Sequence, residues 1–341
     1  MLAAGGTERV SDARTELQII RDALCSSPEL SAKADIQSPA SIASRQSEDG
    51  NPYGLPGDDC AAFPSGEGYQ LLAIEGMLPH FVKSDPWHAG WSAVMANVSD
   101  IAAMGGRATA VVNAYWHHDQ NKTALMMKGI QNACDVFDIT LAGGHTSISM
   151  SHQPGLAVAV LGYATHLLSC HHLEPGHQLY MAVDLGGQWH GENHYWNVLS
   201  GKRRDQVRNL WDLLPQLAKT GVISAAKDIS NGGVFGTLLM MLELNRYGAV
   251  IDMDSIPRPA GPMDFIRWLK AFQSYGFLLA GPQQHAAEVE QHFSAHGITC
   301  KPIGSVSENP SVVFNRADES MEFWNLGQNP LTGMSFPKRR Q

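Results

Sequence analysis

The sequence predicts a mixed α/β protein of two domains, on three observations. The chain has 341 residues, which is more than one ordinary hydrophobic core accommodates. Strand-like and helix-like segments alternate as far as residue 164, as they do in an α/β domain. A short segment at 168–176, with adjacent histidines and a Pro-Gly pair, then precedes a second set of strands and helices. We therefore expect an N-terminal helix and arm over 1–50, one domain over 51–166 and another over 167–341.

The first half begins with apolar residues at helical spacing over 15–25, which predict a short amphipathic helix. The Ser, Pro, Asp and Asn residues of 27–56 predict a loop or arm over the surface. An apolar segment at 70–74 predicts a strand, and a longer one at 89–103 predicts a helix with small residues on several sides. Further strands are expected at 108–115, 139–142 and 156–163, and a helix at 123–137.

The second half begins with a predicted strand at 178–184. The segment 186–202 is irregular and rich in aromatic residues, and a helix is expected after it at 204–220. Further helices are expected at 233–245 and 286–296, and strands at 250–253, 277–280 and 311–314.

Composition and charge narrow the class of partner. The residues are 44% hydrophobic and 17% charged, with 33 glycines, as in a globular protein. The net charge is −9, and basic residues cluster only at 202–204 and 338–340. Nucleic acid is therefore not an expected partner, because binding its phosphates requires clustered cations. A small molecule that carries phosphate remains compatible with this charge if a metal ion supplies the positive charge.

The five cysteines are scattered and form no CxxC pair, which is typical of reduced thiols inside a cell. Residues 1–14 lack the apolar core of a signal peptide. The longest apolar run, at about 156–164, is far shorter than the roughly 20 residues that span a bilayer. We expect a soluble, cytoplasmic protein with no membrane partner.

Two adjacent carboxylates, Asp58 and Asp59, follow a Pro-Gly turn. Side by side near a protein surface, such anions repel by about a few kcal/mol. They are tolerated when both are solvated, which is the commoner arrangement in a loop, or when a cation lies between them. The apolar residues that follow, at 61–63, favour the second arrangement because they draw the pair toward a core.

A second group of polar residues, Asn97, Ser99 and Asp100, lies within an otherwise apolar predicted helix. A buried, unpaired Asp100 would be costly, so it requires a metal, a cation or backbone donors. Alternatively, Asn97 and Asp100 satisfy each other or cap a neighbouring helix. The sequence leaves both arrangements open.

A Gly-Gly pair, Gly143 and Gly144, follows a predicted strand and precedes His145 and Thr146. Backbone N–H groups at such a pair can approach phosphate oxygens closely, with the Thr146 hydroxyl as a further donor. A Gly-Gly pair after a strand is more often just an ordinary turn, so alone it is a weak signal for phosphate binding.

Five ordered motifs resemble one family. They are GDDCAA at 57–62, LLAIE at 71–75, DPWHAGWSAVMANVSDIAAMGG at 85–106, LAGGHT at 141–146 and AKDISNGGVFGTLLMMLE at 226–243. Their order is similar to that of aminoimidazole ribonucleotide synthetase and its relatives, over about residues 55–280. Those relatives include thiamine-monophosphate kinase, selenophosphate synthetase, the hydrogenase-maturation dehydratase and formylglycinamidine ribonucleotide synthetase.

The resemblance implies a homodimer whose N-terminal domains pair into a β-barrel, a C-terminal α/β sandwich domain, and Mg-ATP along the dimer interface. It implies a set of acidic Mg²⁺ ligands, which by position are Asp58, Asp59, Glu75, Asp100 and Asp228. It also implies a set of nucleotide-binding residues, Asn97, Gly143, Gly144, His145 and Thr146. The sequence has no GxxxxGK[ST] loop, in agreement with an ATP site built on metal ions.

Departures from the family's pattern indicate a separate branch. The kinase has aspartates at the positions of His145 and Asn231. The selenophosphate synthetase has a glycine-rich loop with a catalytic Cys or selenocysteine and a nearby Lys, and in the corresponding region this chain has only Cys25 and Lys33. We expect a Mg-ATP-dependent phosphotransferase or ATP-activating synthetase that acts on a small molecule. Because two carboxylates are replaced, a non-catalytic nucleotide-binding regulatory or partner subunit is the alternative.

One further segment, His190-Gly191-Glu192-Asn193-His194, superficially resembles a zinc-binding helix. Its glutamate is misplaced, and Gly and Asn disfavour a helix, so a surface or substrate loop is the stronger interpretation. The neighbouring aromatic residues Trp189, Tyr195 and Trp196 either line a substrate pocket or anchor this loop.

Overall fold

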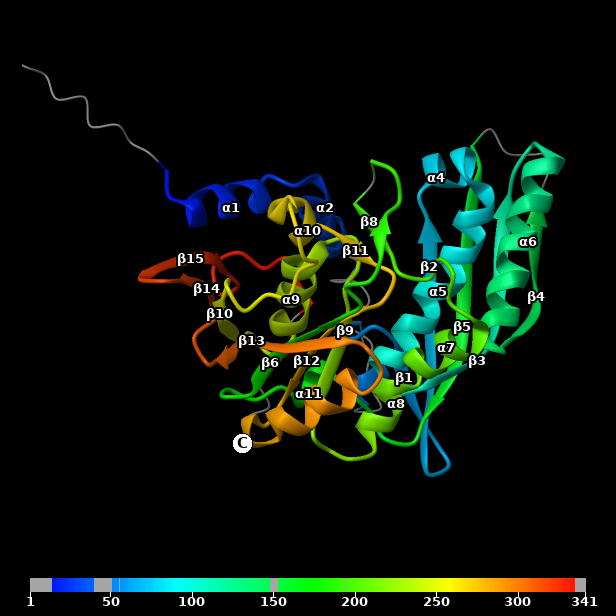
Figure 1. Ribbon diagram of the computed structural model, residues 1–341. Coiled ribbons are helices and arrows are strands. Elements are labelled where there is room, and N and C mark those ends of the chain that lie inside the picture. The colour runs from blue at the N-terminus through cyan, green and yellow to red at the C-terminus, as the bar shows by residue number, and fades with distance from the viewer. Residues whose placement is uncertain (1–13, 40–50, 55, 148–152, 193, 335–341) are drawn as a thin grey trace, which may run out of the picture.

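The computed structural model describes residues 14–39, 51–54, 56–147, 153–192 and 194–334 (Figure 1). The predicted mixed α/β class is confirmed, and each half of the chain forms its own sheet. The expected N-terminal arm over 1–50 lies partly outside the described residues, at 1–13 and 40–50. No helix among the described residues is both long enough and apolar enough to cross a membrane.

The N-terminal segment is more helical than its composition indicates. The predicted first helix is present as α1 (Glu16–Cys25), and Thr15 and Gln18 form a capping box at its start. The expected loop is wrong over the next residues, which form α2 (Pro28–Ser31) and the 3-10 helix η1 (Ala32–Ile36). Serine and proline begin α2 here, because the Ser27 hydroxyl accepts from the Leu30 N–H and Pro28 takes the first helical position.

The first half contains a five-stranded sheet in the order β1-β2-β5-β3-β4. Neighbouring strands are antiparallel except for the parallel β3–β4 pair. The strands are β1 (Ala61–Ser65), β2 (Gly68–Met77), β3 (Arg107–Trp116), β4 (Thr140–Ser147) and β5 (Gly155–Ala164). A short 3-10 helix, η2 (Pro52–Gly54), precedes β1. The strand β4 continues through the glycine pair at 143–144, so the expected turn there is wrong.

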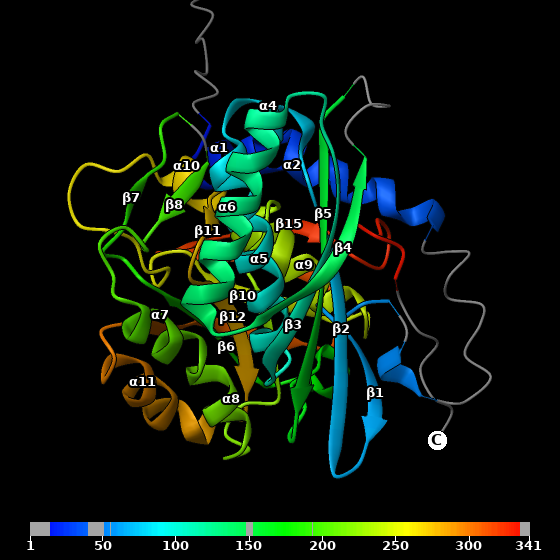
Figure 2. The same cartoon turned by 90° about the vertical axis from the view of Figure 1, so that its right-hand side faces the viewer.

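Helices cover one face of this sheet. They are α4 (Pro79–Ser84), α5 (Pro86–Ala103) and α6 (Gln120–Phe137), and Figure 2 shows α5 and α6 together on one side of the strands. On the opposite face no described helix lies over an exposed set of apolar side chains. Register places these side chains on one face; they are Phe63, Leu72, Ile74, Val112 and Leu161.

The second half contains a seven-stranded sheet in the order β15-β14-β10-β13-β6-β12-β9. In chain order the strands are β6 (Gln178–Val183), β9 (Ala225–Asp228), β10 (Gly248–Asp252), β12 (Gly276–Gly281), β13 (Thr299–Ser307), β14 (Ser311–Arg316) and β15 (Glu319–Asn325). A smaller sheet joins β7 (Gln188–Trp189), β8 (Tyr195–Asn197) and β11 (Phe272–Gln273). The aromatic segment after β6 therefore forms a short hairpin.

The helices of the second half are α7 (Arg204–Trp211), α8 (Leu213–Ala218), α9 (Gly233–Glu243), α10 (Phe265–Leu269) and α11 (Ala286–Ser294), with 3-10 turns η3 (Cys170–His172) and η4 (Gln283–His285). Figure 1 shows α9 and α11 on opposite sides of the large sheet. The single helix expected at 204–220 is divided into α7 and α8, because Pro215 is tolerated only within the first turn of a helix.

The two halves share α5. This helix packs on the first sheet and also contacts β9, α7 and α8 of the second half. The Trp211 indole N–H of α7 donates a hydrogen bond of 3.0 Å to the Ser99 hydroxyl of α5. Because α5 is buried on several sides, it needs the small and apolar residues that its sequence contains.

Candidate functional site

Three carboxylates meet where the two halves join. Asp59 precedes β1, Asp100 lies in the last turn of α5, and Asp228 ends β9. One carboxylate oxygen from each residue lies within 4.8 Å of the others. All three residues are largely withdrawn from solvent: Asp100 is 5% and Asp228 8% exposed, and the Asp59 side chain is 6% exposed. Like charges this close require a compensating cation or proton.

Local backbone features hold Asp59 beside Asp228. Gly57 has a φ of +148°, a conformation that favours glycine, and a Cβ there would lie 2.6 Å from Leu244. The loop that carries Asp59 thus passes close to the end of α9. The backbone N–H of Asp228 donates a hydrogen bond of 3.0 Å to Asp59, which ties this loop to the end of β9.

Burial disfavours the charged form of each carboxylate. Burial, followed by repulsion from neighbouring carboxylates, raises the pKa of Asp100 and of Asp228 well above the ordinary range. Burial also raises the pKa of Asp59, against the opposing effect of Lys227. A bound divalent cation would favour the ionised forms, and carboxylate oxygen is the ligand type that Mg²⁺ prefers.

Lys227 belongs to this site, although the sequence analysis did not select it. Its amine forms a buried ion pair with Asp59. Burial lowers the pKa of Lys227, but the neighbouring acidic groups, with Asp59 foremost, together outweigh that effect, so the pKa is raised and the amine stays charged. The signal was the Lys-Asp pair within the fifth motif. The sequence did not reveal this role, because β9 was not predicted and a lysine next to an aspartate is ordinarily solvated.

Lys33 reaches the same site from the N-terminal segment. Its amine lies 3.3 Å from the Ser230 hydroxyl, just beyond β9. Burial lowers the pKa of Lys33, while Asp228 and Glu75 act in the opposite direction through their charge. The segment around η1 is therefore positioned to place a cation beside the carboxylates.

The other two predicted acidic ligands are not among the three carboxylates within 4.8 Å of one another, although the charge of Glu75 acts on Asp100 and Asp228. Glu75 is half-buried on β2, and burial raises its pKa while the nearby charge of Lys33 lowers it. Asp58 is directed elsewhere: its carboxylate accepts hydrogen bonds from the Ser169 hydroxyl at 2.5 Å and the Cys170 N–H at 2.7 Å. Asp58 thus fastens the start of η3, and the structure does not bring its carboxylate into the group.

Asn97 anchors α5 to the sheet. Its side-chain NH₂ donates to the backbone oxygens of Ala93 at 2.7 Å and Val158 at 2.9 Å. Its Oδ1 is buried, and no partner for it lies among the described residues. The alternative in which Asn97 and Asp100 satisfy each other is therefore wrong.

The predicted phosphate-contacting residues lie at the far edge of the first sheet. All of 143–146 are exposed on β4. Register places Gly144 beside Asn113, then Val158, then Glu75, so three strand spacings separate Gly144 from Glu75. At about 4.8 Å per spacing this is about 14 Å. Within one chain, Gly143, Gly144, His145 and Thr146 do not join the carboxylates; most of them line a shallow hollow of about 320 Å³.

Two protein-family models match this chain, one in each half. The model of the AIR synthase related protein, N-terminal domain, matches residues 57–164, and that of its C-terminal domain matches residues 175–315. The chain belongs to the AIR synthase related family. The predicted superfamily is therefore confirmed.

Individual relatives agree with this assignment. The chain is 40% identical over 309 residues to the protein sll0787 of Synechocystis, covering 89% of this chain and 94% of that one. It is 24% identical over 300 residues to the selenide, water dikinase of Yersinia pestis, covering 74% and 83%. These members of the family are matched along most of their length.

Solved structures share the fold. The PurL protein of T. maritima complexed with ATP has a TM-score of 0.69 at 16% identity, covering 94% of this chain and 55% of that one. The AaThiL protein complexed with AMPPCP and TMP has a TM-score of 0.59 at 17% identity, covering 79% and 91%. At this identity the likeness concerns the fold alone.

Proposed function

We propose that this chain is an ATP-dependent phosphotransferase or ATP-activating synthetase that acts on a small molecule. The observation that carries the proposal is the group of three carboxylates, Asp59, Asp100 and Asp228, within 4.8 Å at the junction of the halves. Their all-oxygen donor set fits Mg²⁺, and their burial makes an unpaired triple anion costly. The family assignment and the ATP complex of the T. maritima PurL protein also support an ATP-dependent function.

In this proposal Asp59, Asp100 and Asp228 hold Mg²⁺, and Glu75 is the remaining candidate ligand at the margin of the site. Asp58, predicted as a further ligand, instead positions the loop through Ser169 and Cys170. When bound, the metal supplies the positive charge that neutralises triphosphate oxygens in this acidic protein. Lys227 keeps Asp59 ionised and oriented. Lys33, held beside Ser230, supplies a cation that can contact a phosphate. The protein contributes orientation and charge rather than a covalent intermediate.

We also propose that the chain works as a homodimer. The apolar face formed by Phe63, Leu72, Ile74, Val112 and Leu161 is left exposed by the described elements, and a second copy would bury it. In a barrel of two such sheets, the nucleotide would extend from the carboxylates along the interface. Asn97 would then hold α5 in register, and the β4 residues 143–146 would contact the nucleotide away from the metal.

The five cysteines are free, as suits a cytoplasmic protein.

The domain limits proposed are an arm over 1–50, an ATP-binding domain over 51–166 and a second domain over 167–341. The two matched family models, at 57–164 and 175–315, support a boundary in this region.

The test is Mg²⁺-dependent ADP formation by the full chain against a panel of small phosphate acceptors. Wild type should form ADP with at least one acceptor, and Asp228→Asn should not. A second candidate function has its own observation: His145 and Asn231, where the kinase relative has aspartates, are both exposed and carry no carboxylate. Mg²⁺-dependent ATP binding without turnover across the panel would support that non-catalytic, nucleotide-binding role and contradict the enzyme proposal.

A further inference from the structure

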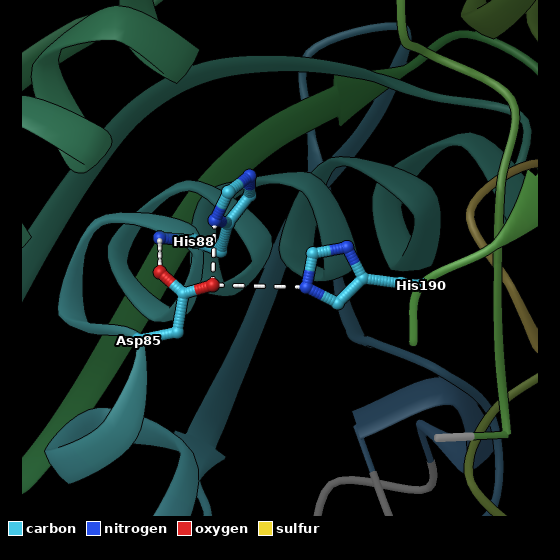
Figure 3. A group of neighbouring side chains, drawn as sticks. All are labelled: Asp85, His88 and His190. Carbon is cyan, nitrogen blue, oxygen red and sulfur yellow. Dashed lines mark hydrogen bonds and ion pairs between the residues drawn. The ribbon is translucent and has the colours of Figure 1, made fainter. Parts of the chain in front are cut away.

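A second set of metal-ligand side chains lies away from the carboxylates (Figure 3). The Asp85 Oδ2 atom is 2.7 Å from Nδ1 of His88 and 3.6 Å from Nε2 of His190. One donor atom from each of the three residues lies within 4.8 Å of the others. Asp85 and His88 begin α5 in the first half, whereas His190 lies on the β7–β8 hairpin of the second half. Folding alone brings these residues together.

Each of the three side chains is held by its own contacts. Asp85 is the N-cap of α5 and accepts from the His88 N–H at 3.4 Å. The N–H of His190 donates to the Tyr195 backbone oxygen at 2.9 Å, and the two rings pack edge to face at 5.7 Å. The His88 and His190 rings lie 5.0 Å apart. The donor atoms thus face one another before any ligand binds, which lowers the cost of binding.

The donor set differs in chemistry from the carboxylate group. Two imidazole nitrogens and one carboxylate oxygen suit a borderline ion of the Zn²⁺ type rather than Mg²⁺ or Ca²⁺. With bonds of about 2.0–2.1 Å, two ligand atoms of a tetrahedral zinc ion lie about 3.3 Å apart. The observed 2.7 and 3.6 Å are on either side of that separation, and each differs from it by less than about 1 Å.

We propose that Asp85, His88 and His190 form a site for a zinc-type divalent ion, separate from the Mg²⁺ site. Asp85 and Asp100 are 15 residues apart on α5, which at about 1.5 Å per residue places them about 22 Å apart along the helix. The side chains are 43%, 35% and 30% exposed for His88, Asp85 and His190, so a water molecule or a ligand can take the fourth position. The ion would link the start of α5 to the β7–β8 hairpin.

The second histidine of that hairpin is not part of the site. His194 lies 3.7 Å from Glu29 of α2, a different partner from that of His190. The superficial zinc-helix pattern at 190–194 is therefore not what would bind the metal, and Asn193 lies outside the described residues. His194 is consequently a matched control on the same hairpin.

The test is titration of the metal-stripped full chain with Zn²⁺ in excess Mg²⁺, in competition with a chromophoric chelator. Wild type should bind one equivalent. His190→Gln should bind at least about tenfold more weakly, since even the loss of an outer partner of a ligand costs about 10–100-fold. His194→Gln and Asp100→Asn should bind as wild type does. Zn²⁺ should raise the melting temperature of the binding proteins only.

Three outcomes would overturn the proposal. Wild type could fail to bind Zn²⁺, His190→Gln could bind as tightly as wild type, or Asp100→Asn could abolish binding, which would place the zinc among the carboxylates. His88→Gln provides a second variant, because it removes a ligand from the helix rather than from the hairpin. None of these measurements depends on ATP, so a failed zinc site leaves the proposed function untouched.

Discussion

The Asp100→Asn substitution separates a metal-binding carboxylate from a structural one. Asp100 is buried within 4.8 Å of Asp59 and Asp228, and burial raises its pKa. Asparagine has nearly the same shape and removes the negative charge. If the three carboxylates are metal ligands, the metal-free variant should be as stable as wild type or more stable, because like-charge repulsion is relieved.

The magnitude follows from the geometry. Two unit charges within 4.8 Å of each other repel by at least about 3.5 kcal/mol at an effective dielectric constant of about 20. Partial protonation of the group already relieves much of this repulsion, so we expect a gain of about 0–1 kcal/mol. For wild type, Mg-ATP at about 100 times its Kd should add about 2.7 kcal/mol of stability. That increment should vanish in Asp100→Asn.

The assay is thermal unfolding of wild type and variant, each with and without Mg-ATP. Asp58→Asn serves as the contrasting variant, because both hydrogen bonds of Asp58 go to the protein at Ser169 and Cys170. Without ligand, Asp58→Asn should lose about 1–3 kcal/mol of stability. An Asp100→Asn protein that melts lower than wild type yet responds fully to Mg-ATP would refute the metal-site reasoning.

Three further predictions follow from the same contacts. Lys227→Met should lower the free energy of unfolding by about 3–5 kcal/mol, because Asp59 is left buried and unpaired. Adding Asp59→Asn should recover part of the loss. A Lys227→Met protein as stable as wild type by urea unfolding would contradict the buried ion pair. Since burial raises the pKa of Asp100, the folded chain binds protons more tightly than the unfolded chain. Wild type without metal should therefore lose stability, relative to Asp100→Asn, as pH rises from about 4 through the raised pKa, and pH-dependent melts in a chelator should show that slope. Ile74→Asp, on a face where Ile74 is 68% exposed, should convert a dimer into a monomer in sedimentation, whereas Leu125→Asp on α6 should not; a wild type that sediments as a monomer at micromolar concentration would refute the dimer.

The elements that the sequence predicts correctly have strong local signals. The helix α6 has a clear apolar period, and β12 is a continuous apolar run. The missed strands lack such signals. A proline interrupts β1 at Pro64, and β9 is only four residues long and ends in Lys-Asp. These segments become strands because neighbouring strands supply hydrogen-bond partners, which is information that a short window of sequence does not contain.

The candidate site likewise combines residues that the sequence identifies with contacts that only the fold creates. The resemblance to the family selected Asp59, Asp100 and Asp228 by their positions in the motifs. Whether the three converge depends on contacts between distant parts of the chain, as when the Asp228 N–H meets Asp59. The same contacts direct Asp58 toward Ser169 instead.

The sequence by itself determined the family, the mixed α/β class and most of the acidic residues. Only the tertiary structure decided that Lys33 and Lys227 reach the carboxylates and that the glycine pair lies within β4. It also decided which histidine of the hairpin contacts Asp85, namely His190 and not His194. The physical reason is the distance along the chain over which each kind of interaction acts. Helix and strand preferences act over a few residues, whereas charge and coordination act through space between side chains that chain folding brings within a few ångströms.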